Sequence, residues 1–220
     1  MESQHIQNKK DNKEIVVHSL SVGQLATNCY ILAAGGKNYI IDPGGDGTYI
    51  GETLLKLQMI PQAIFLTHGH FDHMLGAFEI STAFGIPTYV SKRDSFLVER
   101  MQQTAEHFLK YAVDDIPPKP LFFYEDGKLL DSNVRILYTP GHTPGSVCLD
   151  VVGFPVLFTG DTLFAGGFVG ETNHEYSSKQ ELQKSLSLIN AFEEETILFP
   201  GHGESTTLYD IRHTSEKELV

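Results

Sequence analysis

The sequence predicts an α/β protein with two groups of β-strands, each accompanied by helices. Short segments rich in Val, Ile, Leu and Phe, bounded by glycine and proline, alternate with segments whose apolar residues recur at helical spacing. The alternation occurs twice, once in residues 14–112 and again in residues 134–199. Two sheets packed face to face with helices outside would satisfy this pattern, although periodicity alone does not select it over other mixed α/β layers.

The first half begins with strands and continues with alternating helices and strands. Gly35 and Gly36 separate two strand-like segments, as the turn of an antiparallel hairpin does. The expected strands are residues 15–20, 29–33, 38–41, 63–67 and 88–90, and the expected helices are residues 48–59, 72–84 and 95–112.

The second half follows a proline-rich loop at Pro117, Pro118 and Pro120. Its expected strands are residues 134–138, 146–152, 156–159 and 196–199, and its expected helix is residues 179–191. Residues 1–13 are polar and mixed in charge, so we expect a flexible N-terminal extension there and a single domain over residues 14–220.

Composition narrows the classes of partner. The chain has 220 residues, with 16 Lys and Arg against 28 Asp and Glu, and the formal charge of −12 has the wrong sign for nucleic-acid binding. No apolar run reaches the ~18 residues that span a bilayer, and the polar N-terminus lacks the apolar core of a signal peptide. We therefore expect a cytoplasmic monomer or homodimer that acts on a small molecule, with no nucleic acid or membrane as partner. Cys29 and Cys148 lie in apolar segments and are expected to be buried free thiols.

The strongest chemical signal is the motif His68-Gly69-His70-Phe71-Asp72-His73, which directly follows a predicted buried strand. Imidazole nitrogens and carboxylate oxygens are the ligands that suit Zn²⁺ and neighbouring first-row metals. The glycine lets the backbone turn so that the first two histidines converge. Asp72 and His73, at the start of the next predicted helix, would point elsewhere and could serve a second ion.

Three later motifs each consist of a strand that ends in a glycine-bounded loop with one further ligand candidate: His142, Asp161 and His202. Each alone is weak evidence, because a histidine in such a loop is usually a surface residue. Together with the first motif they make seven candidate ligands, enough for two metal ions that share one carboxylate.

This ligand pattern resembles the metallo-β-lactamase superfamily, whose mark is His-x-His-x-Asp-His followed by separated His, Asp and His ligands. The resemblance covers about residues 16–211, and residues 28–32 and 41–45 look like the N-terminal strands of its glyoxalase II-like branch. It implies an αββα sandwich of two mixed β-sheets flanked by helices, with the site at one edge between the sheets. The implied ligands are His68, His70 and His142 for the first metal, Asp72, His73 and His202 for the second, and Asp161 as a bridge.

The resemblance also implies the chemistry. Two divalent ions, zinc in the first instance with iron or manganese as alternatives, would share a bridging hydroxide that attacks a carbonyl carbon. Asp72 and Asp161 would be catalytic through the ions that they hold. A thiolate leaving group needs little help from an acid, and no general acid is evident beyond the ligands, which favours thioesters over amides.

The glyoxalase II-like branch suggests a thioesterase acting on S-2-hydroxyacylglutathione or a similar small thioester. Two features depart from that branch. The chain ends 18 residues after His202, short of the C-terminal helical domain of long members, and it carries Glu171 in the segment where members place basic and tyrosine residues. Hydrolysis of lactones or esters at the same dinuclear site, and persulfide dioxygenation at a single iron, therefore remain alternatives.

Asp42 follows the apolar segment 39–41 and has two interpretations. It either orients a ligand histidine from behind, as carboxylates next to metal sites often do, or is an ordinary turn aspartate before Pro43. His107, in the helical segment 95–112, is more simply a packed or exposed bystander than a substrate contact.

Overall fold

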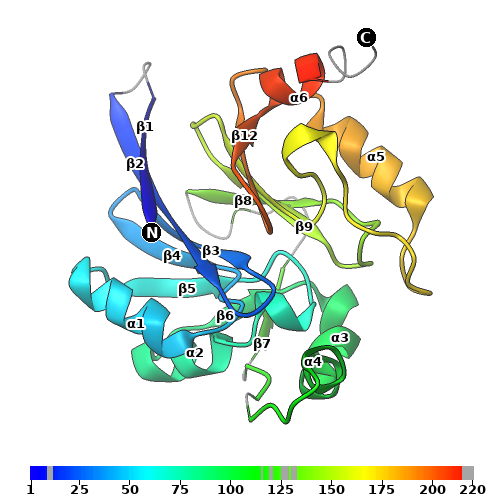
Figure 1. The fold of residues 1–220 in the computed structure, drawn as a ribbon. Coiled ribbons are helices and arrows are strands. Elements are labelled where there is room, and N and C mark those ends of the chain that lie inside the picture. Colours follow the sequence, from blue (N-terminus) through cyan, green and yellow to red (C-terminus); the bar gives the residue numbers. More distant parts are fainter. Residues whose placement is uncertain (9–11, 115, 119–120, 125–128, 130–132, 215–220) are drawn as a thin grey trace. The chain divides into compact units, whose positions relative to one another are not determined.

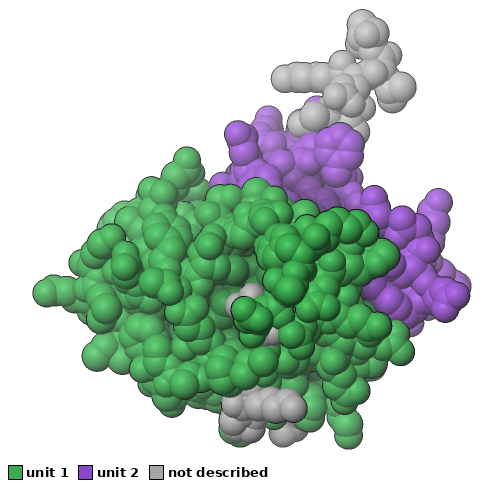
Figure 2. Space-filling model, turned by 60° about the horizontal axis from the view of Figure 1, so that its bottom comes forward, with its two compact units in different colours: residues 1–123 green, residues 124–220 purple. Residues whose placement is uncertain are grey.

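The chain forms two compact units in a computed structural model (Figure 1). The structure describes residues 1–8, 12–114, 116–118, 121–124, 129 and 133–214, so Pro120 of the predicted loop and residues 9–11 of the predicted extension lie outside the described residues. Unit 1 comprises residues 1–123 and unit 2 residues 124–220, and the two are coloured separately in Figure 2. The single domain over residues 14–220 stays a prediction.

Unit 1 contains a seven-stranded mixed sheet in which the strands follow chain order. Strands β1 to β4 are antiparallel neighbours, whereas β4 to β7 are parallel. The strands are β1 (Glu2–Asn8), β2 (Lys13–Val22), β3 (Thr27–Ala34), β4 (Lys37–Ile41), β5 (Pro61–Phe65), β6 (Thr88–Val90) and β7 (Leu121–Phe123). The helices are α1 (Gly47–Lys56), α2 (Ala77–Phe84), α3 (Ser95–Glu99) and α4 (Met101–Leu109), with 3₁₀ turns η1 (Phe71–His73) and η2 (Lys92–Asp94).

The core of unit 1 lies between its sheet and its helices. Helices α1 and α2 lie side by side along one face of the sheet (Figure 1). Ile40 and Ile64 of the sheet pack in one buried cluster with Leu54 of α1, Ile80 of α2 and Met101 of α4. Burial of this apolar face stabilises the parallel part of the sheet, from whose end the histidine motif emerges.

Unit 2 contains a five-stranded mixed sheet in the order β12-β11-β10-β9-β8, in which only β10 and β11 run parallel. Its strands are β8 (Val134–Tyr138), β9 (Val147–Val151), β10 (Val156–Gly160), β11 (Ile197–Pro200) and β12 (Thr206–Thr207). Its helices are α5 (Lys179–Ile189) and α6 (Leu208–Thr214), with the 3₁₀ turn η3 (Ala165–Gly167). Leu157 and Leu198 of the sheet pack against Ile189 of α5 and Leu208 of α6.

Three local predictions were wrong. Residues 2–8 do not form a loose extension: they are strand β1, paired with β2 in seven residue pairs. The helix predicted over residues 72–84 is the turn η1 followed by α2, because Met74 leaves the helical region with φ −137° and ψ 0°. The helix predicted over residues 95–112 is divided at Arg100 into α3 and α4 and ends at Leu109. Apolar spacing shows which face of a segment is buried, but it does not reveal local breaks in the backbone.

The remaining predicted strands and helices are present with shifts of a few residues at their ends. Among the described residues, no helix combines the length and the hydropathy needed to cross a bilayer.

Both cysteines are free and fully buried, as predicted. Burial raises the pKa of Cys148 to about 12, and it also raises the pKa of Cys29. Because the thiolate is the reactive form, we expect neither cysteine of the native protein to react with Ellman's reagent at pH 7, and both to react after unfolding in guanidinium chloride. The variant Ser187→Cys, on the exposed face of α5, supplies the reactive control. Rapid labelling of the native wild-type chain would contradict the burial of these thiols.

Candidate metal centre

The histidine motif is held at its start by Asp42. Strands β4 and β5 are parallel, with Ile41 opposite Phe65, so the residues that follow them leave the sheet at the same edge. Asp42 follows β4, and its Oδ1 accepts a 2.7 Å hydrogen bond from the backbone N–H of Thr67, just after β5. The Thr67 hydroxyl donates to Asp42 Oδ2 at 2.6 Å. These two bonds fix where the histidine loop begins.

The same carboxylate orients two histidines. Nδ1 of His73 lies 2.9 Å from Asp42 Oδ2, and both side chains are buried. Nδ1 of His68 lies 3.1 Å from Thr67 Oγ1, whose own proton points to Asp42, so this oxygen accepts from the imidazole. Each Nδ1 therefore carries the proton and each buried Nε2 keeps its lone pair, the form in which histidine binds metals. These contacts agree with the interpretation of Asp42 as an orienting carboxylate, which stays a prediction.

A second buried carboxylate, which sequence reasoning missed, holds the middle of the loop. Oδ2 of Asp94 accepts a 2.9 Å hydrogen bond from the backbone N–H of Gly69. A Cβ at position 69 would lie only 2.8 Å from the Cβ of Asp94, so the loop requires glycine there. The sequence carries no local signal for this contact, because Asp94 lies 25 positions from its partner in a segment that looks like an ordinary helix start.

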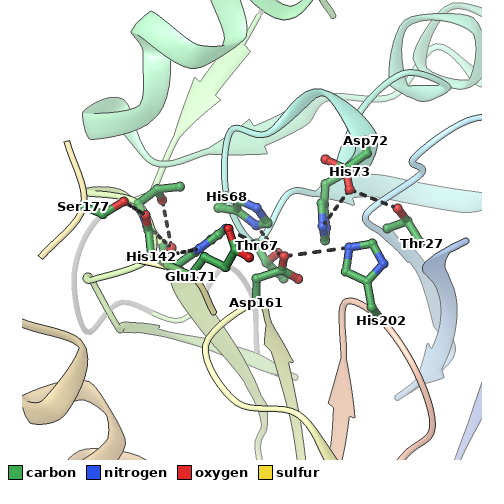
Figure 3. A network of polar contacts seen from close by, with 12 residues as sticks. Thr27, Thr67, His68, Asp72, His73, His142, Asp161, Glu171, Ser177 and His202 are labelled. Atoms are coloured by element: carbon green, nitrogen blue, oxygen red, sulfur yellow. Dashed lines mark hydrogen bonds and ion pairs between the residues drawn. The ribbon is translucent and has the colours of Figure 1, made fainter. Parts of the chain in front are cut away.

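The four motif residues of unit 1 lie close together. The rings of His68 and His70 meet edge to face with centroids 4.7 Å apart, and the centroids of His68 and His73 are 4.2 Å apart. Nε2 of His73 is 3.7 Å from Asp72 Oδ2, a distance too long for a hydrogen bond. Two ligand atoms that bind the same ion, each at about 2.1 Å from it, lie roughly 3–3.6 Å from one another. The pair is thus within a few tenths of an ångström of the spacing that a shared ion imposes. Figure 3 shows Asp72 also accepting a hydrogen bond from the Thr27 hydroxyl, at 3.3 Å.

The three candidate ligands of unit 2 converge on one carboxylate oxygen. His142 follows β8, Asp161 follows β10 and His202 follows β11. Oδ2 of Asp161 lies 3.7 Å from Nε2 of His142 and 3.8 Å from Nε2 of His202 (Figure 3). These distances again match ligands that share ions better than hydrogen-bonded pairs. An oxygen nearly equidistant from two imidazoles is compatible with a ligand of one ion or with a bridge between two.

The backbone around residue 170 orients His142. Its Nδ1 donates a 2.8 Å hydrogen bond to the carbonyl oxygen of Glu171, so Nε2 keeps the lone pair. Ser177 donates to the carbonyl oxygen of His142 at 2.7 Å. A Cβ at Gly170 would lie 2.0 Å from the backbone oxygen of Asp161 and 3.0 Å from the His142 ring, so only glycine permits this approach.

Two residues weighed from the sequence have other roles. The backbone carbonyl of Glu171 accepts the hydrogen bond from His142, and the sequence could not reveal this contact because every residue has a carbonyl. The side chain of Glu171 is exposed and accepts a 2.9 Å hydrogen bond from Asn173. His107 is exposed on α4, where its ring meets the edge of Phe108.

The fold and these ligands define a metal-binding protein of the metallo-hydrolase class. Residues 22–202 match the family model described as the metallo-beta-lactamase superfamily, and the chain therefore belongs to this superfamily. The predicted family is thereby confirmed, as is the predicted fold class of two mixed β-sheets flanked by helices.

Similar proteins cover nearly the whole chain. A hydroxyacylglutathione hydrolase, GloC, of Haemophilus influenzae is 31% identical over 198 residues, which are 87% of this chain and 92% of that protein. An uncharacterized protein of Mycobacterium tuberculosis is 34% identical over 210 residues, 88% of this chain and 93% of that protein. A crystal structure described as TTHA1623 in a di-iron-bound form is 32% identical and aligns with a TM-score of 0.85, over 90% of this chain and 98% of that chain.

The contacts of Asp42 predict its effect on metal affinity. Asp42→Asn keeps the shape of the side chain but removes the charge that stabilises the Nδ1–H tautomer of His73. We expect a 10- to 100-fold loss of zinc affinity, on the order seen when such partners of a ligand histidine are replaced. Competition with a chromogenic chelator measures it. Asp114→Asn, an exposed change of the same kind, is the control. Equal zinc affinity of the wild type, Asp42→Asn and Asp114→Asn would mean that Asp42 is an ordinary turn residue.

Proposed function

We propose that this protein is a dinuclear metallo-hydrolase that cleaves small thioesters, with S-2-hydroxyacylglutathione as the first candidate. The observation that carries the proposal is the common orientation of three histidines: in His68, His73 and His142, Nδ1 is engaged by an oxygen and Nε2 keeps its lone pair. The proposed ligands are His68, His70, Asp72 and His73 of unit 1 with His142, Asp161 and His202 of unit 2.

The residues present fit divalent first-row metals. Five imidazoles and two carboxylates are a nitrogen and oxygen donor set that suits zinc, iron and manganese. The 3.7–3.8 Å spacings within each unit agree with bound ions, and the similar distances from Asp161 Oδ2 to two imidazoles support a bridging role for this carboxylate. The di-iron form of the similar crystal structure supports two ions rather than one. We propose zinc as the working metal, with iron and manganese as the alternatives that metal analysis separates.

The metal ions and the residues that hold them would have different tasks in the reaction. When bound, two such ions supply Lewis acidity toward a carbonyl oxygen and a water deprotonated near neutral pH. Asp72 and Asp161 offset part of the positive charge, and the Thr27 hydrogen bond holds one Asp72 oxygen in place. Asp42 keeps the imidazole of His73 in the tautomer that ligation needs.

The polar neighbours of the proposed ligands indicate which kind of leaving group the protein can expel. The hydroxyl proton of Thr27 is engaged by Asp72, and that of Thr67 by Asp42. These hydroxyls orient ligands and are not free to protonate a departing group. A thiolate, which leaves without a proton, suits this arrangement better than an amine. The similarity to the hydroxyacylglutathione hydrolase of Haemophilus influenzae supports the same choice.

Hydrolysis of S-D-lactoylglutathione by zinc-reconstituted protein tests the proposal. We expect kcat/KM of about 10⁴ M⁻¹s⁻¹ or more. In Asp161→Asn it should fall at least ~100-fold with loss of bound zinc, because one carboxylate would serve both ions. The hydrolysis rates of lactones and simple esters, measured in parallel, test the alternative of a lactone or ester hydrolase. Oxygen uptake on glutathione persulfide by protein holding one iron, without thioester turnover, would overturn the proposal.

The charge of Glu171 bears on glutathione as the leaving group. Its exposed carboxylate should repel the carboxylates of glutathione, so Glu171→Arg should lower the KM for S-D-lactoylglutathione by about two- to fivefold at low salt. Glu171→Gln should give an intermediate value. Glu193→Arg makes the same charge change at another exposed position and controls for net charge. A KM that does not respond to Glu171→Arg would mean that glutathione does not approach this residue.

A further inference from the structure

We infer that a cavity in unit 1, beside Asp72, binds the acyl chain of the substrate, and that it favours uncharged, apolar chains of about four to eight carbons over the three-carbon lactoyl group. The inference deepens the proposed thioester hydrolysis and rests on it for the identity of the ligand. The cavity has a volume of about 400 Å³, and it is formed by the turn after β2, the turn after β4, the residues around η1, and the end of α4.

The position of the cavity ties it to the candidate metal centre. Asp72 and Thr27 both line it, and they are joined by the hydrogen bond that anchors the carboxylate. Figure 3 shows these two side chains pointing toward one another. A ligand in the cavity would therefore lie next to a proposed metal ligand, which is where the acyl group of a substrate must lie for its carbonyl to reach the ions.

The lining combines polar residues with five apolar or aromatic side chains, and the outer ones of these are exposed. Phe71 and Leu75 are 6% and 9% exposed and form its buried side. Leu25 and Tyr111, which also line it, are 46% and 49% exposed. Phe108, 58% exposed, stacks on Phe71 with ring centroids 5.7 Å apart. Large apolar side chains left half in water mark a surface that gains free energy when an apolar ligand covers it.

The charge of the lining disfavours an anionic ligand. Asp46 and Asp72 are its charged residues, and none of the described residues that line it is basic. Since a bound ion would offset the charge of Asp72, the repulsion of the two carboxylates of a glutathionyl group would come from Asp46, and it favours a position of the thiol part outside this cavity. A two- or three-carbon acyl group, the lactoyl group included, would fill less of the volume than a chain of four to eight carbons.

The cavity walls are tied together before any ligand binds. Gln24, in the turn after β2, donates a 3.2 Å hydrogen bond from Nε2 to the hydroxyl of Tyr111, beyond the end of α4. This bond joins segments 87 positions apart. A ligand therefore enters walls that are already assembled, which reduces the entropy cost of binding.

A chain-length series with a neutral thiol tests the inference. The substrates are the acetyl, butyryl, hexanoyl and octanoyl thioesters of N-acetylcysteamine, assayed with the zinc-loaded protein. Each buried methylene favours binding, so kcat/KM should rise roughly tenfold for every two methylenes until the cavity is full. In Leu109→Trp, which fills the cavity from α4, this dependence should disappear. In Leu25→Ala, at the exposed mouth, it should weaken. Leu55→Ala, an equally simple change at a 69% exposed leucine on α1, should retain the wild-type dependence.

A binding measurement separates this inference from the proposed function. Ketone analogues with a methylene inserted between sulfur and carbonyl cannot be hydrolysed, and calorimetry gives their affinity for each variant. If thioesters are hydrolysed with no dependence on chain length, or with a dependence that both cavity variants retain, the cavity assignment is wrong and the hydrolase stands. If no thioester is hydrolysed, the proposed function fails. The assignment then stands only if the hexyl-length ketone binds the wild type at least about tenfold more tightly than Leu109→Trp, and falls otherwise.

Discussion

The candidate metal centre of unit 1 depends on the hydrogen bonds of one buried carboxylate. Asp42 accepts from the backbone and hydroxyl of Thr67 and faces Nδ1 of His73. It controls His68 as well, because the Thr67 hydroxyl that donates to it is thereby left to accept from that imidazole. The carboxylate is 1% exposed, so these bonds operate without competition from water. Two ligand tautomers and the start of the histidine loop thus follow from one side chain.

Parallel strand pairs explain why the ligands gather where they do. The carboxyl ends of parallel neighbours meet at one edge of a sheet. In unit 1, β4 and β5 deliver Asp42 and the histidine motif to such an edge. In unit 2, β10 and β11 are the parallel pair, and Asp161 and His202 follow them directly. A parallel strand pair in each unit thus positions candidate ligands or their hydrogen-bond partners that are far apart in sequence.

The proposed acyl cavity shares Asp72 and Thr27 with the candidate metal centre, but its outer walls come from other parts of unit 1. The ligands and their hydrogen-bond partners lie at strand ends and on the short loop after β5, where the core holds the backbone. The cavity beside Asp72 takes its walls from the turn after β2 and the end of α4, and its outer side chains are half exposed. Segments of this kind tolerate sequence change better than the ligand loop does. If both proposals hold, the same metal ligands could be combined with acyl cavities of different shape.

The residue pattern was enough to predict the α/β class, the buried free thiols, the superfamily and the candidate ligands. Metal ligation needs particular side chains at particular spacings, and strands and helices impose periodic apolar patterns, so both can be recognised before the fold is known. The tertiary structure was needed to show that Asp42 contacts Thr67 and His73, that Asp94 lies against the histidine loop, and that the Glu171 carbonyl accepts a hydrogen bond from His142. It also placed residues 2–8 in a strand and divided two predicted helices. The contacts of Asp42, Asp94 and Glu171 join residues 25 or more positions apart. Strand β1 and the helix breaks depend on backbone groups that every residue carries, so none of these features leaves a local pattern in the sequence.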